Sequence, residues 1–380
     1  MQEHSPTDPT ATRPDEAVLF VALELSRASW LVAIQAPGGD KISRHKLAAG
    51  ASAELLELVA RQRARAEQRT GRTVRVMSCY EAGRDGFWLH RLLVANGIEN
   101  LVIDPASVAV NRRARRVKTD RIDVETLLRT RMAHARGERR VCSVVRVPTP
   151  EAEDARRLTR EREALLQERV RHVNRVKALC ALQGVYDFEP LRPRAAERLE
   201  RLVTGDGRPF PERLKAEVRR QLQRLEQVVR QIAEVEALRD EPASPLAAGV
   251  ARLVALRGLG PNVASVLQAE ILGRRFGNRR EVAQYAGLAP SPWASGGTRR
   301  EQGIGKAGNA RVRAAMIELA WLWLRHQPGS ALSRWFRERV GQARGLVRRI
   351  AIVAVARRLL IALWRYAVGG LAPEGATVRG

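Results

Sequence analysis

The sequence has few cysteines, and they are far apart. Cys79, Cys142 and Cys180 are odd in number and show no paired spacing. This excludes a disulfide framework and gives no zinc-ligand pattern. Unpaired thiols are typical of a reducing compartment, so we expect a cytoplasmic protein.

Long apolar runs are also missing. The N-terminus, MQEHSPTDPTATRPDE, is polar and rich in proline, which excludes a signal peptide there. The best candidate for a membrane span is Ile350–Trp364. Arg357 and Arg358 interrupt this segment, which is also shorter than the roughly 20 apolar residues that a span requires. We therefore expect no membrane partner.

Acidic residues are scarce relative to basic ones. The 67 Lys and Arg exceed the 41 Asp and Glu by enough to give a net charge of +26, and only six of the 67 are Lys. This excess predicts a polyanionic partner such as nucleic acid or an anionic membrane surface. It determines affinity and association rate rather than fold. The 45% of hydrophobic residues is ordinary for a folded protein.

The N-terminal part reads as an α/β domain. Apolar stretches at 17–25, 29–35 and 41–47 predict antiparallel strands, because turn residues separate the last two. A helix over 53–69, capped by Ser52, precedes a further strand, helix and strand at 73–80, 86–96 and 98–104. We therefore predict a domain with a mixed sheet over residues 16–150, preceded by a disordered tail at 1–15.

The rest of the chain has helical periodicity. Segments 151–183 and 211–240 carry apolar residues at helical spacing. In the first they are Leu158, Leu165, Val173, Val176 and Leu179; in the second they are Leu222, Leu225, Val229 and Ile232. We predict a coiled-coil-like helical hairpin over 151–245, which is a spacer or a dimerisation arm. Residues 246–370 predict short helices with glycine-rich turns, and 371–380 a loose tail.

Four carboxylates are candidates for a metal site. Glu24 and Glu81 end predicted strands, and Asp120 and Asp123 are spaced to share one face of a helix. Carboxylates at neighbouring strand ends repel one another unless a divalent cation neutralises them. Mg²⁺, or Mn²⁺, in such a site polarises phosphate oxygens. In such a site, basic neighbours such as Lys118 and Arg121 could hold the phosphate backbone nearby. The alternative is that each acid is solvated or forms a salt bridge with these basic residues.

A glycine-rich turn in the last domain is typical of a phosphate site. In LVALRGLGPNVASVLQAEI (253–271), Gly258 and Gly260 flank the turn and Pro261 opens the next helix. This is the helix-hairpin-helix pattern, in which turn amides hold a DNA phosphate without reading sequence. A plain pair of packed helices has the same signature.

The segment 285–313, YAGLAPSPWASGGTRREQGIGKAGNARVR, holds two more signals. Its G-x-G-x-x-G at 303–308 is not a dinucleotide site, because we expect no strand before it and no βαβ unit around it. Ser295 lies among glycines on an expected loop, where serine usually only forms a turn, and no triad signature accompanies it. Basic and amide residues that could contact phosphates are Arg299, Arg300, Lys306, Asn309 and Arg311.

Together these segments resemble the DEDD-type insertion-sequence transposases of the "one-ten" family, also called bridge-RNA-guided recombinases. The resemblance covers about residues 17–370 and rests on the order and spacing of several motifs. These are ALELSR, YEAGRDGFWLHRLL, VKTDRIDVETLL, HVNRVKALCALQG, LRGLGPNVASVLQAEI, QYAGLAPSPWASGGTRREQGIGKAGNARVR and LVRRIAIVAVARRLLIALW.

The resemblance implies a RuvC-like RNase H fold, a helical hairpin and a C-terminal transposase domain with a nucleophilic serine. The acidic tetrad would be Glu24, Glu81, Asp120 and Asp123, and the serine would be Ser295. Glu24 departs from the motif, which usually begins with Asp. The resemblance also implies DNA as donor and target, a structured element-encoded guide RNA, a homodimer that assembles into a tetramer, and a bacterial, nucleoid-associated location.

Two other functions remain open at this point. A metal-dependent, structure-specific endonuclease would use water in place of Ser295. A non-catalytic relic of a transposase would only bind nucleic acid, with Glu24 as a first sign of decay. A covalent protein–DNA adduct separates the recombinase from the endonuclease, and metal-dependent cleavage separates both from the relic.

Overall fold

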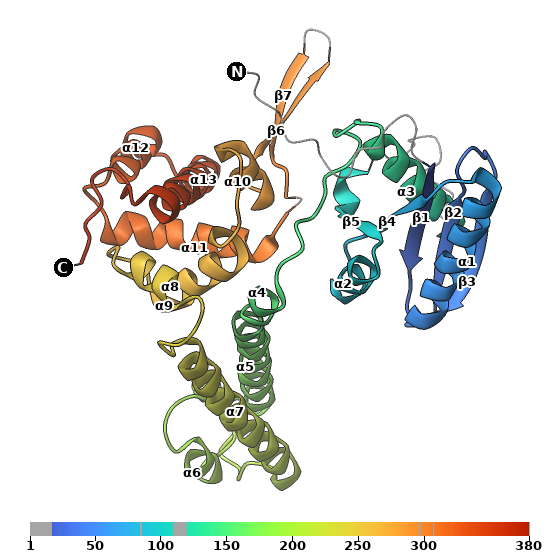
Figure 1. The fold of residues 1–380 in the computed structure, drawn as a ribbon. Coiled ribbons are helices and arrows are strands. Elements are labelled where there is room, and N and C mark those ends of the chain that lie inside the picture. Colours follow the sequence, from blue (N-terminus) through green and yellow to red (C-terminus); the bar gives the residue numbers. More distant parts are fainter. Residues whose placement is uncertain (1–16, 84–85, 109–119, 296–297, 307, 380) are drawn as a thin grey trace. The chain divides into compact units, whose positions relative to one another are not determined.

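The computed structural model describes residues 17–83, 86–108, 120–295, 298–306 and 308–379. It divides into two compact units, Met1–Pro148 and Thr149–Gly380 (Figure 1). The predicted tail at 1–15 lies outside the described residues. The predicted boundary at 245/246, inside the second unit, stays a prediction.

The first unit is built on a five-stranded mixed sheet. Its strands are β1 (Ala17–Leu25), β2 (Ser29–Gln35), β3 (Ile42–Ala48), β4 (Val74–Glu81) and β5 (Glu99–Ile103), in the spatial order β3-β2-β1-β4-β5. The first three strands form an antiparallel meander, and β4 and β5 run parallel to β1. The predicted mixed sheet is confirmed.

Helices cover both faces of this sheet, which explains why β1 is apolar almost throughout. Leu19 and Leu23 pack with side chains of α1 (Ser52–Thr70) and α2 (Trp88–Ala95) on one face. Ala22 packs with α3 (Asp120–Ala135) on the other. Alternate residues of a strand point to opposite faces, so both sets must be apolar.

Two local features of the first unit differ from expectation or extend it. Ser52 is the first residue of α1 rather than its cap; Ala51 occupies the cap position, and no side chain caps the helix. After α3, the segment 141–148 forms an antiparallel bridge from Val144 to Ile103. The amide of Val145 donates to the carbonyl of Val102 at 2.7 Å, so this connector adds to the edge of the sheet.

The second unit begins with a short helix, α4 (Pro150–Asp154), and two long helices, α5 (Arg157–Ala181) and α7 (Glu212–Arg239), with α6 (Ala195–Glu200) between them. Ion pairs join Arg162 to Glu236 at 2.5 Å and Arg175 to Glu217 at 2.7 Å. Since the pairs run in opposite directions along the chain, α5 and α7 pack antiparallel. Their buried side chains follow three- and four-residue spacing. Val229 is an exception to the prediction, because it is 41% exposed and Val228 takes its place in the seam.

The remaining helices of the second unit surround one core. They are α8 (Ala247–Val254), α9 (Pro261–Leu267), a π-helical turn, η3 (Gln268–Leu272), α10 (Arg279–Tyr285), α11 (Ala310–His326), α12 (Ala331–Val340) and α13 (Leu346–Gly369). The membrane candidate Ile350–Trp364 lies within α13, whose buried side chains join this core. No helix in the described part of the chain is long and apolar enough to cross a membrane.

The sequence predicts a loose C-terminal tail, but the structure shows this segment paired with the helical core. Val378 forms an antiparallel bridge with Leu256, and the amide of Arg379 donates to the carbonyl of Ala255 at 2.6 Å. The amide of Thr377 donates to the buried side chain of Gln327 at 2.7 Å. Backbone pairing therefore holds this segment against the helical core.

A β-hairpin interrupts the helices between α10 and α11, where the sequence predicts only loops. Its strands, β6 (Pro290–Ser295) and β7 (Thr298–Ile304), pair antiparallel and project from the helical part of the second unit (Figure 1). Gly303 therefore lies in a strand, against our expectation. A dinucleotide site requires a parallel βαβ unit, whereas this strand belongs to an antiparallel hairpin. The G-x-G-x-x-G at 303–308 is therefore still not a dinucleotide site.

Candidate active site

Two predicted carboxylates lie side by side at the ends of the central strands. β1 and β4 pair in parallel with Leu23 opposite Tyr80, so the register places Glu24 beside Glu81. Neighbours in register on parallel strands share a face of the sheet. This is the face of Ala22 and Cys79, which α3 covers, and both Glu side chains are half-buried there.

Helix α3 brings its first turn to the same end of the sheet. The Cys79 thiol donates to the carbonyl oxygen of Leu127 at 3.5 Å, and Nε of Arg131 donates to the carbonyl oxygen of Ser78 at 3.2 Å. Further along the helix, Ala135 packs near Met77. The helix thus runs antiparallel to β4, and its start, with Asp120 and Asp123, lies toward the end of β4 that carries Glu81.

The donor set suits a hard divalent cation, because all four side chains offer carboxylate oxygens. Asp123 is half-buried, whereas the side chain of Asp120 lies outside the described residues. Among the side chains that the structure describes, no group of three His, Cys, Asp or Glu could hold a metal ion. A metal site at this end of the sheet stays a prediction that depends on Asp120.

Beneath these carboxylates lie two buried polar side chains, Cys79 and Arg131. Burial raises the pKa of the Cys79 thiol to about 12, against the opposing charge of Arg131, and Glu81 adds to the rise. The thiol is therefore neutral at physiological pH and is neither a nucleophile nor a metal ligand. Burial also lowers the pKa of the Arg131 guanidinium. The carboxylates are therefore the groups at this end of the sheet that remain candidates for binding a metal.

Ser295 is the last residue of β6 and pairs in register with Thr298 of β7. It therefore lies at the turn of a hairpin rather than in a loop. Arg299 and Arg300 follow in β7, opposite Ala294 and Trp293. The side chains of Ser295, Arg299 and Arg300 lie outside the described residues, as do Gly296 and Gly297 and the side chain of Arg121. Lys118 also falls outside them, so these roles stay predictions.

Asn309, a predicted phosphate contact, forms hydrogen bonds with other residues of the chain. It is the N-cap of α11, where its Oδ1 accepts hydrogen bonds from the amides of Arg311 and Val312 at 3.0 and 3.2 Å. Its Nδ2 donates to Glu270 at 3.0 Å. Arg311 in turn forms an ion pair with Glu163 of α5. Lys306 is exposed, just before this helix.

Glu270 is a residue that the sequence analysis missed. It lies in η3, is 1% exposed, and accepts hydrogen bonds from Nε and Nη2 of Arg160 at 2.9 and 3.2 Å. Burial opposes its ionisation, but Arg160, Asn309 and Arg156 together hold the pKa of its carboxyl below the ordinary value. Glu270 therefore ties α5 to the start of α11. The signal was available as one carboxylate in the otherwise uncharged stretch VASVLQAEIL.

We expect Glu270→Gln to lower the free energy of unfolding by about 2 kcal/mol, because it removes the charge that accepts hydrogen bonds from a partly exposed Arg160. Urea unfolding measures this. The folded-state pKa is lowered, so the contribution is complete above the unfolded value of about 4.3 and is lost as the pH falls through the folded value. The control is Glu318→Gln on the exposed side of α11, expected within about 0.5 kcal/mol of wild type. Equal stability of the two variants would contradict the role of Glu270.

The glycine-rich turn between α8 and α9 has a defined backbone. Gly258 has φ +91°, and a Cβ there would meet Cβ of His326 at 2.7 Å. Gly260 occupies the cap position of α9, and Pro261 is its first residue. The turn lines a surface pocket of about 450 Å³ together with Arg257 and Arg379. Conformation and space therefore require glycine at position 258, whatever the turn binds.

Comparison with known proteins identifies the family. The model of the transposase IS116/IS110/IS902 family matches residues 250–335, and a model of DEDD transposases of the IS110 type matches residues 25–186. The chain is also 51% identical to "Putative transposase y4rJ" of Sinorhizobium fredii, over 98% of both proteins. The chain belongs to the IS110 family of transposases. The resemblance seen in the sequence is confirmed.

Two further relatives carry the same kind of name. "Putative transposase y4qE" of Sinorhizobium fredii is 32% identical over 68% of this chain and 61% of its own length. "Probable family 20 transposase" of Pseudomonas aeruginosa is 28% identical over 58% of this chain and 65% of its own length. The DEDD match begins at Leu25, the last residue of β1 and one position after Glu24, and it spans Glu81, Asp120 and Asp123. The second match spans Ser295 and the turn of Gly258 and Gly260. In this IS110-family transposase, the two matched segments thus carry most of the predicted site residues.

Proposed function

We propose that this IS110-family chain cuts and rejoins DNA strands during transposition, with Ser295 as the nucleophile and Glu24, Glu81, Asp120 and Asp123 as a metal-binding tetrad. One observation carries the proposal: Glu24 and Glu81 lie side by side at the ends of parallel strands, on the face where α3 begins with Asp120. Mg²⁺ or Mn²⁺ bound there would polarise phosphate oxygens and neutralise developing charge. Ser295 would attack the phosphodiester, displace the 3′-hydroxyl of one strand and form a 5′-phosphoserine-type link, and attack by a strand hydroxyl would then release the serine.

The architecture supports finer assignments. The strand order β3-β2-β1-β4-β5, with β1 antiparallel to β2 and parallel to β4, supports a RuvC-like RNase H fold for the first unit. The antiparallel packing of α5 and α7 supports a helical hairpin as linker or dimerisation arm. The Gly258 turn between α8 and α9 supports a helix-hairpin-helix that holds a phosphate.

An element-encoded RNA and a tetramer complete the proposal. The net charge of +26 supports binding to RNA as well as DNA, and RNA pairing would supply the sequence specificity that a phosphate-binding surface lacks. A tetramer would let the serine of one protomer meet the carboxylates of another.

The test uses the full-length protein, labelled DNA carrying the element's ends and insertion site, and RNA transcribed from the non-coding DNA beside the gene. We expect rejoined strands only when the RNA and Mg²⁺ or Mn²⁺ are both present. Rejoining that survives removal of the metal by chelation contradicts the tetrad. Cleavage without rejoining, and without a protein–DNA adduct, assigns the chain to the water-using endonuclease instead.

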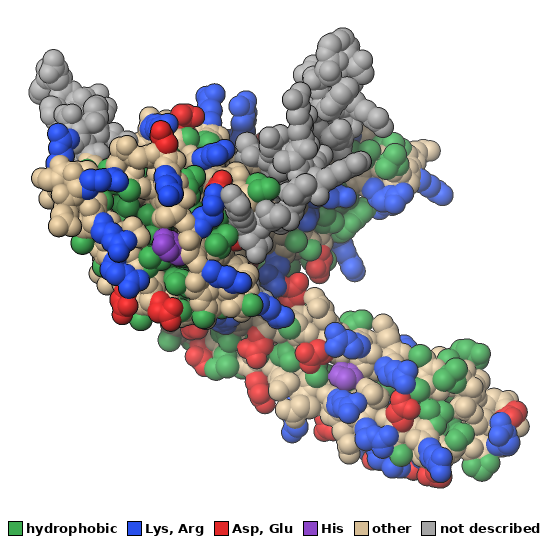
Figure 2. Space-filling view, turned by 90° about the vertical axis from the view of Figure 1, so that its right-hand side faces the viewer, with side chains coloured by type: hydrophobic (Ala, Val, Ile, Leu, Met, Phe, Trp, Pro, Cys, Tyr) green, Lys and Arg blue, Asp and Glu red, His purple; other side chains and the backbone are tan. Residues whose placement is uncertain are grey.

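Nucleic-acid binding should weaken steeply with salt. In the sequence, segments 111–121 and 299–313 are rich in arginine and lysine. Figure 2 shows many basic side chains on the described part of the surface. Each phosphate contact contributes roughly one unit to the log–log slope of affinity against salt. Fluorescence anisotropy at several salt concentrations measures the slope. A nearly flat dependence would mean that the excess of arginine is compositional and does not serve binding.

A further inference from the structure

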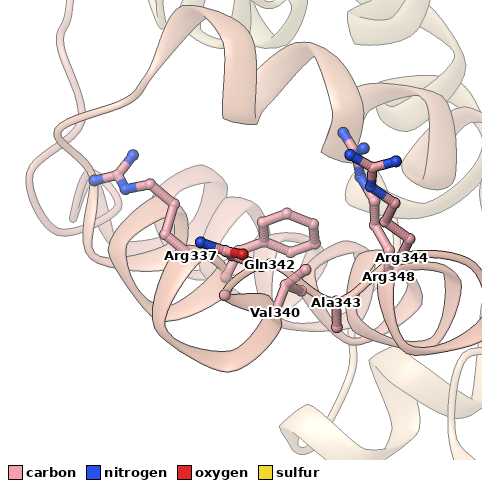
Figure 3. A pocket seen from close by; sticks show the side chains of 8 residues that line it. Arg337, Val340, Gln342, Ala343, Arg344 and Arg348 are labelled. Carbon is pink, nitrogen blue, oxygen red and sulfur yellow. The ribbon is translucent and has the colours of Figure 1, made fainter.

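The connection between α12 and α13 forms an open pocket lined with arginines. Its volume is about 600 Å³. The lining residues come from the end of α12, the connection itself and the first turn of α13 (Figure 3). They are Phe336, Arg337, Val340, Gly341, Gln342, Ala343, Arg344 and Arg348. The lining therefore contains three guanidinium groups and no carboxylate.

The three arginines keep their hydrogen-bond donors available. None of the ion pairs between described residues involves Arg337, Arg344 or Arg348. In Figure 3, Arg344 and Arg348 project on one side of the pocket and Arg337 on the opposite side. Like charges around one hollow repel each other, and an anion between them relieves that repulsion. The guanidinium fork suits phosphate oxygens in particular.

Packing holds one of these arginines in place. The guanidinium carbon of Arg348 lies 5.1 Å from the ring centre of Trp321 on α11, and the same ring meets Phe336 edge-on at 6.3 Å. A guanidinium stacked on an aromatic face still presents its N–H groups at its edges. Trp321 therefore orients Arg348 without consuming its donors.

The backbone of the connection also suits an anion. Gly341 (φ +52°, ψ −124°) and Gly345 (φ +65°, ψ −121°) adopt a conformation that side chains rarely allow, although open space surrounds both. They form a tight bend that places Arg344 and Arg348 on the same pocket. Gly345 caps the 24-residue α13 and offers no side-chain acceptor, so the first amides of that helix have no cap.

We propose that the α12–α13 pocket binds the phosphates of a nucleic-acid backbone, at a site separate from Ser295 and from the Gly258 turn. The inference rests on the proposed function, which makes nucleic acid the ligand of this chain. Arg337, Arg344 and Arg348 supply charge and paired donors, and Trp321 is a positioning residue for Arg348. Since the three guanidinium groups would contact phosphates, these contacts contribute affinity and register and carry no sequence information themselves.

The experiment measures the salt dependence of binding by the full-length protein, using labelled RNA and DNA strands of one sequence, without divalent metal. The variant replaces Arg337, Arg344 and Arg348 by Gln. We expect the log–log slope to fall by about two units for single strands, at roughly 0.7 per phosphate contact. A larger fall with RNA or with DNA shows which strand occupies the pocket, and either supports the proposal.

Two controls distinguish a loss of pocket contacts from a general loss of positive charge and from misfolding. Arg192, Arg201 and Arg213, exposed arginines near α6, are replaced by Gln to give the same change in net charge, and their slope should stay within about half a unit of wild type. Replacement of the three pocket arginines by Lys should keep the slope but weaken binding, because the charge remains and the fork is lost.

Equal slopes for the pocket variant and the α6 control would overturn the proposal. So would a Lys variant whose slope falls as far as that of the Gln variant, since this would indicate altered folding. A wild-type protein that binds neither strand would instead overturn the proposed function, so the two failures are distinguishable.

Discussion

Ser295→Ala should remove every covalent protein–DNA product. Ser295 ends β6 at the turn of the β6–β7 hairpin, and the next two residues in the sequence, Gly296 and Gly297, have no side chain that could obstruct a phosphate. If its hydroxyl attacks the phosphodiester, the methyl group of alanine has no nucleophilic oxygen to take its place. The measurement is a denaturing gel of labelled DNA incubated with protein, the RNA beside the gene and Mg²⁺.

Ser291→Ala is the matched control for this variant. Ser291 lies in the same strand, four residues earlier and next to Pro292, and the variant should keep most of the covalent product. A Ser295→Ala protein that still yields the adduct would exclude this serine as nucleophile. Free cleaved DNA with no shifted band, even from the wild type, would favour a nuclease that uses water.

Asp123→Asn should reduce strand transfer at least a thousandfold, which corresponds to about 4 kcal/mol in the barrier. The change keeps the size of the side chain in the first turn of α3 and removes the charge needed near the reacting phosphate. Nucleic-acid binding should remain almost intact, because the basic surface is unchanged. Quantifying rejoined DNA and, separately, anisotropy of the same labelled DNA tests both parts.

Glu125→Gln is the control on the same helix. Glu125 forms an ion pair with Arg44 of β3 at 2.5 Å, so its loss affects packing of α3 rather than the end of the sheet. We expect near-normal strand transfer from it, and also from Glu24→Asp, which restores the residue usual in the family's motif. Near-normal recombination by Asp123→Asn would rule out Asp123 as a member of the tetrad.

The first unit could be predicted from sequence because its signals are local. Apolar runs bounded by Pro, Gly and charged residues gave the five strands, and in-register pairing then brought Glu24 to Glu81. The spacing of Asp120 and Asp123 predicted a shared helix face, and α3 begins at Asp120. Whether Glu24 and Glu81 come close to Asp120 depends on how α3 packs on the sheet, and no local sequence pattern determines that packing.

The second unit was harder for identifiable reasons. β6 contains Pro290 and Pro292 and shows a register irregularity between them, so its sequence lacks a strand pattern. Val228 and Val229 are both apolar, and only packing against α5 selects Val228 for the seam. Glu270 reads as an ordinary helix residue until Arg160, more than a hundred positions earlier, is placed beside it.

The two ends of the β6–β7 hairpin lie next to each other where they join the helical core. Beyond its base, the amide of Gly305 donates to the carbonyl of Ala289 at 2.9 Å, and the amide of Asn309 donates to the carbonyl of Tyr285 at 2.7 Å. Gly308 fits tightly there, because a Cβ would lie 2.5 Å from that carbonyl oxygen. The two ends are thus fastened independently of what lies between them. Substitutions along the hairpin should therefore leave the stability of the helices nearly unchanged, so any loss of activity that they cause can be assigned to the hairpin itself.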